Sequence, residues 1–335
     1  MEPANTDPIV NLEEMTIGYV PESVLLEGIN LSVMPGELVA LVGRNGTGKS
    51  TLLRSIMGLL PVMEGECRLF GASVRTYDLR RRARMVSYVS SQVPAMPSIT
   101  VRELVSLGRM PHTGWTGRQN REDRDMVRKA VRELSIEHFL DRKVDQLSDG
   151  ECHRAMIARA FSQDTPLMVL DEPTAFLDIP NKYELIRILS RLRDGGKSII
   201  FSTHDLETAW LWADKFWVIH RGEIREGAPE DLGMRGVFDD LFADSGITFD
   251  RSERRFVPYF APRGTVRLTG KGGAVMNWTR TALDRLGFKT DQDTGDPAIR
   301  ITSQGEGYCW QVIRHQTEKT FDSIYSLARF LIQVE

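Results

Sequence analysis

The sequence lacks several features that mark whole classes of protein. Its three cysteines, Cys67, Cys152 and Cys309, lie far apart and form no Cys-x-x-Cys pair, a scattered and odd-numbered set that suits a reducing cytosol. No apolar run approaches the ~18 residues that a membrane-spanning helix needs. The first residues, MEPANTDPIV, lack the basic and apolar regions of a signal peptide. We therefore expect a cytosolic protein, although not one that is necessarily far from a membrane.

An excess of charge of one sign is also missing. Lys and Arg number 43 against 46 Asp and Glu, and the formal net charge of −3 gives no reason to expect a nucleic-acid partner. The short basic run at residues 80–84 has no interleaved aromatics, which favours a solvated helix face over a nucleic-acid patch. The length of 335 residues suits a large domain plus a small one.

The stretch Leu38–Leu53, LVALVGRNGTGKSTLL, predicts a buried strand, a glycine-rich turn and the start of a helix. Within it Gly43, Gly48, Lys49 and Ser50 fit the phosphate-loop pattern G-x-x-x-x-G-K-[ST]. The glycines let the backbone approach a polyphosphate, and a run of N–H groups and the helix dipole then face its negative charge. Lys49 adds a positive charge near the outer phosphates, and the Ser50 hydroxyl is placed to bind Mg²⁺. The pattern predicts binding of a nucleoside triphosphate.

A second candidate site follows the apolar run Leu167–Leu170, which is typical of a parallel sheet buried on both faces. Asp171 and Glu172 come directly after it, where ligands bind in such sheets. Asp171 can hold the Mg²⁺ shell, and Glu172 can orient or deprotonate an attacking water. Such a pair is often only a solvated loop, but the upstream phosphate loop favours the chemical interpretation. His204 follows a further apolar strand, where it can sense a γ-phosphate, although a lone histidine is usually just a satisfied polar residue.

Patterning predicts the elements around these motifs. Residues 9–42 alternate apolar and polar in short runs, which indicates a β-rich segment that feeds the phosphate-loop strand. Tyr19, in this segment, is on its own best explained as an aromatic that packs on a strand. Two capping-box patterns open helices, at Thr100 with Glu103 and at Ser148 with Glu151.

The whole set resembles the ATP-binding subunit of an ATP-binding cassette (ABC) transporter. Seven motifs follow the family's order: the adenine-stacking aromatic Tyr19, the Walker A loop Gly43–Thr51, the Q-loop Gln92, the signature Leu147–Glu151, the Walker B strand Leu167–Glu172, the D-loop Ala175–Asp178 and the switch His204. The resemblance implies an α/β P-loop NTPase fold over residues 8–245. Its parallel sheet core would carry an N-terminal β subdomain and a helical subdomain.

The same resemblance implies a role for each matching residue. The residues that would bind ATP are Tyr19, Gly43, Arg44, Asn45, Gly46, Thr47, Gly48, Lys49, Ser50 and Thr51. The catalytic residues would be Lys49, Gln92, Glu172 and His204, and the Mg²⁺ ligands Ser50, Gln92 and Asp171. The signature residues that would contact the ATP of a second subunit are Ser148, Asp149, Gly150 and Glu151, with Asp178 in the D-loop.

The signature departs from the family's usual LSGGQ at two positions. Asp149 replaces a glycine and Glu151 replaces the glutamine, whereas Ser148 and Gly150, which contact the γ-phosphate in this family, are kept. Two acids near a triphosphate should weaken that contact unless they point away from it. Glu151 has a local explanation as the partner of Ser148 in the capping box, but Asp149 has none.

The segment Val101–His112, VRELVSLGRMPH, is similar to importers of metal chelates, namely ferric siderophores, haem and cobalamin. In this family the segment lies in the helical subdomain that meets the permease. It can therefore record the class of the membrane partner. The alternative is generic similarity within the family.

The resemblance ends near residue 246, and residues 246–335 predict a small α+β domain. TVRLTG predicts a strand, Trp278–Leu286 a helix, and AIRIT with YCWQVIRH a hairpin. A final helix would carry, at helical spacing, Phe321, Ile324, Ala328 and Leu331. Tyr308 and Trp310 are expected in the core. The domain shows no metal or catalytic constellation, and a regulatory role or a role in bracing a dimer are both open.

The resulting hypothesis is an ATPase, the ATP-hydrolysing subunit of an importer for iron-siderophore, haem or cobalamin. Two copies would form a head-to-tail homodimer, with ATP and Mg²⁺ held between each phosphate loop and the opposing signature. An integral membrane permease would be a separate chain, served indirectly by a substrate-binding protein. The subunit would then lie peripherally at the cytoplasmic face of the inner (plasma) membrane.

Two other functions stay open. One is a soluble, non-transport ABC ATPase of translation or DNA repair, although such proteins usually carry two cassettes or long inserted coiled coils. The other is a regulatory scaffold that binds ATP without turnover, and the presence of Glu172 and His204 argues against it.

Overall fold

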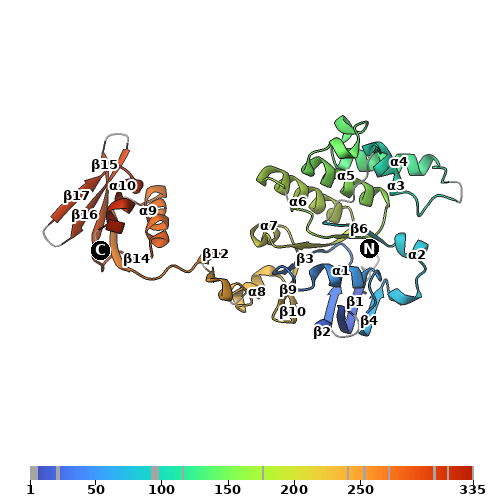
Figure 1. Cartoon of the computed structure of the whole chain (residues 1–335), viewed down its shortest axis with the longest axis horizontal. Coiled ribbons are helices and arrows are strands. Elements are labelled where there is room, and N and C mark those ends of the chain that lie inside the picture. Colours follow the sequence, from blue (N-terminus) through green and yellow to red (C-terminus); the bar gives the residue numbers. More distant parts are fainter. Residues whose placement is uncertain are drawn as a thin grey trace, which may run out of the picture. The chain divides into compact units, whose positions relative to one another are not determined.

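The computed structural model describes residues 7–19, 23–91, 98–114, 117–175, 177–239, 241–251, 254–270, 272–304, 307–314 and 317–333. The chain divides into two compact units (Figure 1). The first comprises Met1–Leu241 and Arg251–Arg255, and the second comprises Phe242–Asp250 and Phe256–Glu335. Within the described residues, no helix is long and apolar enough to cross a membrane.

The first unit begins with an antiparallel sheet, in line with the alternating pattern of residues 9–42. Its strands, in the spatial order β2-β1-β4-β5, are β2 Ser23–Val33, β1 Val10–Tyr19, β4 Glu64–Leu69 and β5 Ala72–Ser73. Alternate side chains are buried at the start of β1 and in the second half of β4, so there one face of the sheet supplies core and the other meets solvent, whereas residues 15–18 of β1 are all buried.

A second sheet in the first unit is parallel except at one edge. Its strands, in the spatial order β10-β9-β3-β8-β7-β6, are β10 Glu223–Gly227, β9 Lys215–His220, β3 Leu38–Gly43, β8 Ser198–Thr203, β7 Leu167–Leu170 and β6 Val86–Val89. Every residue of β3, β7 and β8 is buried, as their continuous apolar runs predict. Because these three strands are parallel neighbours, their carboxyl ends meet at one edge.

The helices of the first unit are α1 Lys49–Ile56, α2 Leu79–Ala83, α3 Val101–Leu107, α4 Arg121–Glu133, α5 Asp149–Ser162, α6 Ile179–Asp194, α7 Leu206–Trp210 and α8 Pro229–Met234. Figure 1 shows α3, α4 and α5 on the opposite side of the parallel sheet from the antiparallel sheet. Both predicted capping boxes form, at Thr100 with Glu103 and at Ser148 with Glu151.

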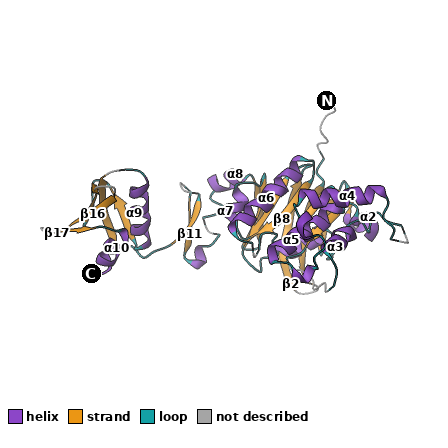
Figure 2. Cartoon of the chain, turned by 90° about the horizontal axis from the view of Figure 1, so that it is seen from above, coloured by secondary structure: helices purple, strands orange, loops and turns teal. Residues whose placement is uncertain are grey.

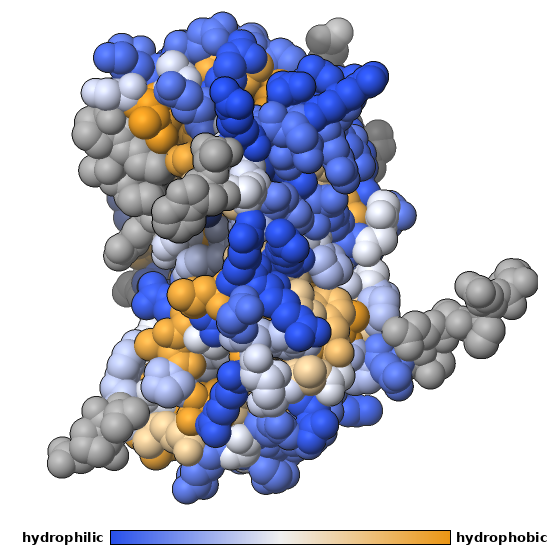
Figure 3. Space-filling view, turned by 90° about the vertical axis from the view of Figure 1, so that its right-hand side faces the viewer, coloured by the Kyte–Doolittle hydropathy of each residue, from blue (hydrophilic) through white to orange (hydrophobic). Residues whose placement is uncertain are grey.

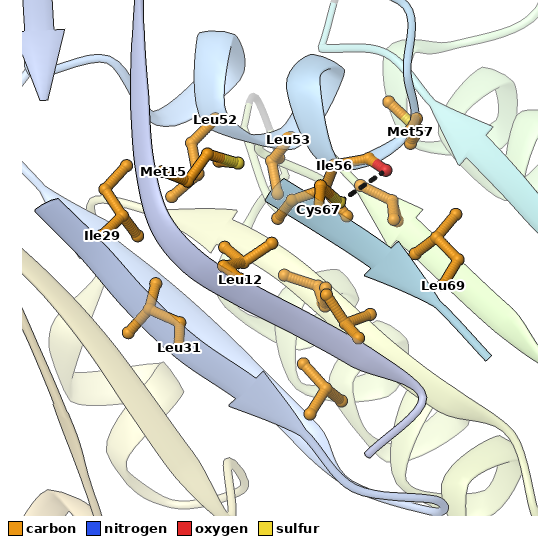
Figure 4. Close-up of a cluster of buried hydrophobic side chains, with 14 of the residues drawn as sticks. Leu12, Met15, Ile29, Leu31, Leu52, Leu53, Ile56, Met57, Cys67 and Leu69 are labelled. Atoms are coloured by element: carbon orange, nitrogen blue, oxygen red, sulfur yellow. Dashed lines mark hydrogen bonds between the residues drawn. The ribbon is translucent and has the colours of Figure 1, made fainter. Parts of the chain in front are cut away.

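Helix α1 joins the two sheets into one core. Its side chains Leu52, Leu53 and Ile56 belong to a buried cluster that takes residues from both the antiparallel and the parallel sheet. Figure 4 shows these side chains beside Met15 and Cys67 of the antiparallel sheet, where the Cys67 thiol donates to the Ile56 carbonyl at 3.6 Å. The phosphate-loop helix is thus fixed between two layers.

The second unit carries its own core. The elements from residue 247 onward are β11 Ile247–Asp250, β12 Arg255–Pro258, β13 Gly264–Gly270, α9 Ala274–Arg285, β14 Phe288–Asp291, β15 Ala298–Gln304, β16 Gly307–Arg314, β17 Thr317–Phe321 and α10 Ile324–Gln333. A five-stranded sheet has the order β14-β13-β15-β16-β17, and the predicted hairpin forms between β15 and β16. One buried cluster joins this sheet to α9 and α10.

Three expectations about the second unit need correction. The helix predicted from Trp278 begins earlier, at Ala274, after Gly273. Phe321 ends strand β17 rather than contributing to the last helix, because the helix begins only at Ile324. Tyr308 is 45% exposed and not core, whereas Trp310 is buried and its indole N–H donates to Thr279 Oγ1 at 2.8 Å.

Candidate nucleotide-binding site

The phosphate loop joins the end of β3 to the start of α1, as predicted. Gly46 and Gly48 have φ values of 81° and 98°, in the left-handed region that glycine adopts at little cost. A Cβ on Gly43 would lie 2.8 Å from Thr47 Oγ1 and 3.1 Å from the Ile219 carbonyl oxygen, so a side chain there would have to displace its neighbours. Arg44 and Asn45 are exposed at the loop tip. The loop therefore offers backbone groups at the amino end of a helix, which suits an anion.

Lys49 is buried at the base of this loop. Its ammonium group donates to the carbonyls of Gly43 at 2.9 Å and Arg44 at 3.1 Å, and lies 3.8 Å from Glu172 Oε1. Burial lowers the pKa of Lys49, and the carboxylates of Glu172 and Asp171 oppose that change by favouring the charged form. The side chain links the phosphate loop to the acidic pair.

The acidic pair is held in place by a serine that the motif analysis missed. Ser202, fully buried on β8, donates its hydroxyl to Asp171 Oδ1 at 2.7 Å and accepts from the Glu172 backbone N–H at 2.8 Å. Glu172 has a φ of 49°, which is unusual for a residue other than glycine and costs free energy. One side chain therefore fixes both the Asp171 carboxylate and the strained turn that aims Glu172.

Glu172 lies between the phosphate loop and the switch histidine. Its two carboxylate oxygens lie 3.8 Å from Lys49 Nζ and 3.7 Å from His204 Nδ1. The His204 side chain is 57% exposed and follows directly after β8. The structure thus brings together three of the predicted catalytic residues, while Gln92, the fourth, lies outside the described residues.

Tyr19 lies at the edge of the same site. It ends β1, its ring is 57% exposed, and its hydroxyl shares a hydrogen bond of 3.1 Å with Thr51 Oγ1 on α1. Ser50 is only partly buried in the first turn of α1. The tyrosine ring is therefore tied to the phosphate-loop helix and open on the solvent side, an arrangement that suits stacking on a flat base.

The signature residues form a separate cluster at the amino end of α5. Ser148, Asp149, Gly150 and Glu151 line a hollow of about 420 Å³ together with residues of the D-loop region, Leu177, Asp178 and Asn181. Asp178 caps α6 by accepting from the Asn181 backbone N–H at 3.0 Å. No residue of the phosphate loop lines this hollow. The two predicted halves of the site are thus separate clusters.

The Glu151 carboxylate points back into its own helix end. It accepts from the Ser148 backbone N–H at 2.9 Å and from Arg142 Nη1 at 2.8 Å. The backbone hydrogen bond from Ser148 is the largest cause that lowers the pKa of Glu151, with the Arg142 guanidinium adding to it. Its charge is therefore balanced locally. Asp149 is exposed in the first turn of α5, where the helix dipole favours a negative charge.

The importer-like segment Val101–His112 has internal structural reasons for much of its sequence. Arg109 is buried and donates to Asp123 Oδ1 at 2.9 Å. A Cβ on Gly108 would lie 2.2 Å from the Arg159 carbonyl, so this glycine permits close contact with α5. His112 Nε2 is 2.8 Å from the Gln163 carbonyl. The segment packs α3 against α4 and α5.

We expect Ser202→Ala to lower the free energy of unfolding of the first unit by about 1–3 kcal/mol, because the buried Asp171 carboxylate and Glu172 N–H lose their partner. Urea denaturation measures this. Ser190→Ala is the matched control, because the buried Ser190 hydroxyl on α6 has no hydrogen-bond partner among the described residues. The control should be neutral or stabilising. Equal destabilisation by both substitutions would contradict the tethering role of Ser202.

Comparisons with known proteins identify the family. The family model described as ABC transporter matches residues 26–175, and a second, described as iron ABC transporter C-terminal domain, matches residues 263–332. The petrobactin import ATP-binding protein FpuC of Bacillus anthracis is 36% identical over 255 residues, which cover 76% of this chain and 92% of that protein. The chain belongs to the ABC transporter family.

Other relatives agree with that assignment. The ferric enterobactin transport ATP-binding protein FepC of Escherichia coli (strain K12) is 36% identical over 232 residues, which cover 69% of this chain and 85% of that protein. A solved dimer of the ATP-binding cassette MJ0796, bound to ADP and Pi, has a TM-score of 0.59 and 28% identity and covers 65% of this chain and 98% of its own. ABC cassettes bind ATP, and the predicted P-loop NTPase fold and ATPase activity are confirmed.

The comparisons also correct one prediction. The resemblance to the family was expected to end near residue 246, yet residues 263–332 match the iron ABC transporter C-terminal domain. The sequence showed only generic strands and helices there, without a short motif that carries chemistry. After its nucleotide-binding unit, this chain therefore carries a domain found in iron ABC transporters.

Proposed function

We propose that this chain is the ATP-hydrolysing subunit of an importer for ferric siderophores. The observation that carries the proposal is the match of residues 263–332 to an iron ABC transporter C-terminal domain, in a chain whose relatives are named for petrobactin and enterobactin import. These names favour a siderophore over haem or cobalamin, and transport over translation or DNA repair. We propose a cassette over residues 8–245 and an appended domain over residues 246–335.

Each side chain of the phosphate-loop cluster has a distinct proposed role. The Lys49 ammonium, which has carbonyl partners and acidic neighbours, would transfer its hydrogen bonds to the outer phosphates of ATP. Glu172 would accept the proton of the attacking water, and His204, beside its second oxygen, would orient that carboxylate and contact the γ-phosphate. Tyr19 would stack on adenine from its tether to Thr51.

Mg²⁺ fits the oxygen donors of this cluster. Asp171 is a buried carboxylate close enough to Lys49 to favour its charged form, and Ser50, in the first turn of α1, offers a partly exposed hydroxyl. We assign these two residues and Gln92 as the ones that would hold the ion. Bound there, Mg²⁺ neutralises charge on the phosphates. The role of Ser202 is to hold Asp171 in place for this purpose.

The separation of the phosphate loop from the signature hollow supports a head-to-tail homodimer. In it, Ser148 and Gly150 of one copy would face the γ-phosphate bound by the other, next to Asp178. Because Glu151 is bound to Arg142 and to its own helix end, it would not repel that phosphate. The exposed Asp149 carboxylate would still do so.

A membrane permease is the proposed partner of the surface formed by α2 and the end of α3. Leu79, Leu107 and Met110 are exposed there, at 75%, 44% and 64%. Arg80 and Arg84 donate to the Pro111 carbonyl, which joins the two segments. Figure 3 shows this end of the first unit as mainly hydrophilic with small hydrophobic areas. Such a partner would place the subunit peripherally at the cytoplasmic face of the inner membrane, with a substrate-binding protein supplying the cargo.

The test is to delete the gene for this chain and to measure cellular uptake of radiolabelled ferric siderophores, haem and cobalamin. We expect uptake of at least one ferric siderophore to fall to background and to return with the wild-type gene but not with Glu172→Gln. Haem and cobalamin uptake should stay unchanged. Normal siderophore uptake in a cell without a redundant cassette would contradict the cargo and leave the ATPase activity in place.

A further inference from the structure

The five-stranded sheet of the second unit has one face without helices. Val266 and Leu268 of β13 are buried in the cluster that includes Leu283 of α9 and Leu327 of α10. Figures 1 and 2 show both helices on the same side of the strands. Because successive side chains of a strand point to opposite faces, Arg267 lies on the other face. This helix-free face is polar in its centre.

Register places two arginines close together on that face. In the parallel pairing of β13 with β15, Arg267 lies opposite Ala298 and Thr269 opposite Arg300. Paired residues of neighbouring strands share a face, so the two guanidinium groups stand on adjacent strands, two positions apart in register. A hollow of about 560 Å³ opens here, and its polar lining includes Arg267, Thr269, Gln292, Asp293, Arg300 and Thr302.

Neither arginine has a partner of its own. Among the described residues, the side chains of Arg267 and Arg300 make no hydrogen bond or ion pair. The nearby Asp291 carboxylate is engaged within its loop, where it accepts from the backbone N–H groups of Asp293 at 2.8 Å and Thr294 at 2.7 Å. Asp291, paired with Arg267 in register, and Asp293 balance the two positive charges overall. Neither carboxylate engages a guanidinium group, so within the described part of the chain the N–H donors of both arginines remain open to a ligand.

We propose that this hollow binds a small anion that carries carboxylate or phosphate groups. Guanidinium groups present fixed pairs of donors that match both kinds of oxyanion. The hydroxyls of Thr269 and Thr302 and the Gln292 amide add neutral donors for the remaining oxygens. The volume lies within the range of about 300–1,000 Å³ that is usual for small-molecule sites. The site lies outside the nucleotide-binding unit and does not depend on the proposed cargo.

Isothermal titration calorimetry on the full-length chain tests the proposal, with citrate and pyrophosphate as separate probes. A Lys49→Ala background removes the contribution of the phosphate loop to the pyrophosphate heat. We expect one or both probes to bind, and Arg267→Gln with Arg300→Gln to weaken that binding at least tenfold. Each single substitution should weaken it several-fold. The arm that gives the tighter binding distinguishes a carboxylate from a phosphate ligand.

The matched control is Arg280→Gln, which removes the same charge from an exposed position on α9, across the sheet. It should leave binding within twofold of the parent chain. Circular dichroism and a thermal melt check that each variant is folded. The proposal is overturned if neither probe binds the parent chain, if the double variant binds as tightly as the parent, or if Arg280→Gln weakens binding to the same degree.

Discussion

Replacing Glu172 with Gln is expected to leave ATP binding intact and to lower the rate of ATP hydrolysis by roughly 10²–10⁴-fold. The amide keeps the shape of the side chain but cannot accept the proton of the attacking water. The backbone strain at this position, with φ of 49°, is the same for both residues, and the Ser202 hydrogen bond to the backbone N–H is kept. Phosphate release measures turnover, and equilibrium binding of a fluorescent ATP analogue measures affinity.

Two further measurements make this assignment specific. With Mg²⁺ and ATP the Glu172 variant should accumulate as a dimer in size-exclusion chromatography. The dimer with ATP between each phosphate loop and the opposing signature forms, but hydrolysis no longer opens it. Glu207→Gln is the matched control, because Glu207 is an exposed carboxylate on the nearby α7 and its removal should not affect turnover. Hydrolysis near the wild-type rate in the Glu172 variant would show that another group deprotonates the water.

Replacing Lys49 with Ala should weaken ATP binding itself, by tenfold to about 10²-fold. This range follows from the ~1.5–3 kcal/mol that a hydrogen bond to a charged group contributes. The loss is aggravated because Glu172 and Asp171 then face the triphosphate without the cation that lies among them. Equilibrium binding of ATP without hydrolysis, followed in the absence of Mg²⁺ and again in its presence, measures the effect.

The control for this substitution is Lys143→Ala. Lys143 is an exposed lysine just before the short helical turn that precedes the signature. Nucleotide affinity should be unchanged in that variant. A Lys49→Ala chain that bound ATP as well as the Lys143 variant would mean that the backbone N–H groups of the loop supply nearly all the affinity. The proposed transfer of the Lys49 hydrogen bonds from loop carbonyls to phosphates would then be wrong.

Sequence alone predicted the parts of this protein that depend on local rules. The phosphate loop needs glycine where φ is positive, and Gly48, which the pattern at Gly43–Ser50 fixes, is such a position. Both capping boxes are set by residues three positions apart, Ser148 with Glu151 for example, so they too can be identified without a structure. The buried strand Leu167–Leu170 followed from its continuous apolar run.

The contacts that the sequence did not predict depend on how separate segments of the chain meet in space. Ser202 reaches the acidic pair from 31 positions away because β7 and β8 are neighbours in the sheet. Arg142, in a loop that carries no recognisable motif, donates a hydrogen bond to Glu151 and balances its negative charge. Phe321 fits the helical spacing of the last helix, yet it belongs to β17, because pairing with β16 at Trp310 overrides that spacing. Sheet topology decides the first and the third of these, and the conformation of the loop before α5 decides the second.

The burial of α1 between two sheets has a mechanical consequence. The buried side chains of α1, Leu52 and Ile56 among them, pack against the antiparallel sheet. The phosphate loop therefore cannot move without that sheet, whose strand β1 ends at Tyr19. The hydrogen bond between Tyr19 and Thr51 strengthens this connection. If Tyr19 meets the base as proposed, the two ends of a nucleotide are held by one rigid body. Opening of the dimer would then separate the signature from the phosphates, while the distance between Tyr19 and the phosphate loop within each subunit stays constant.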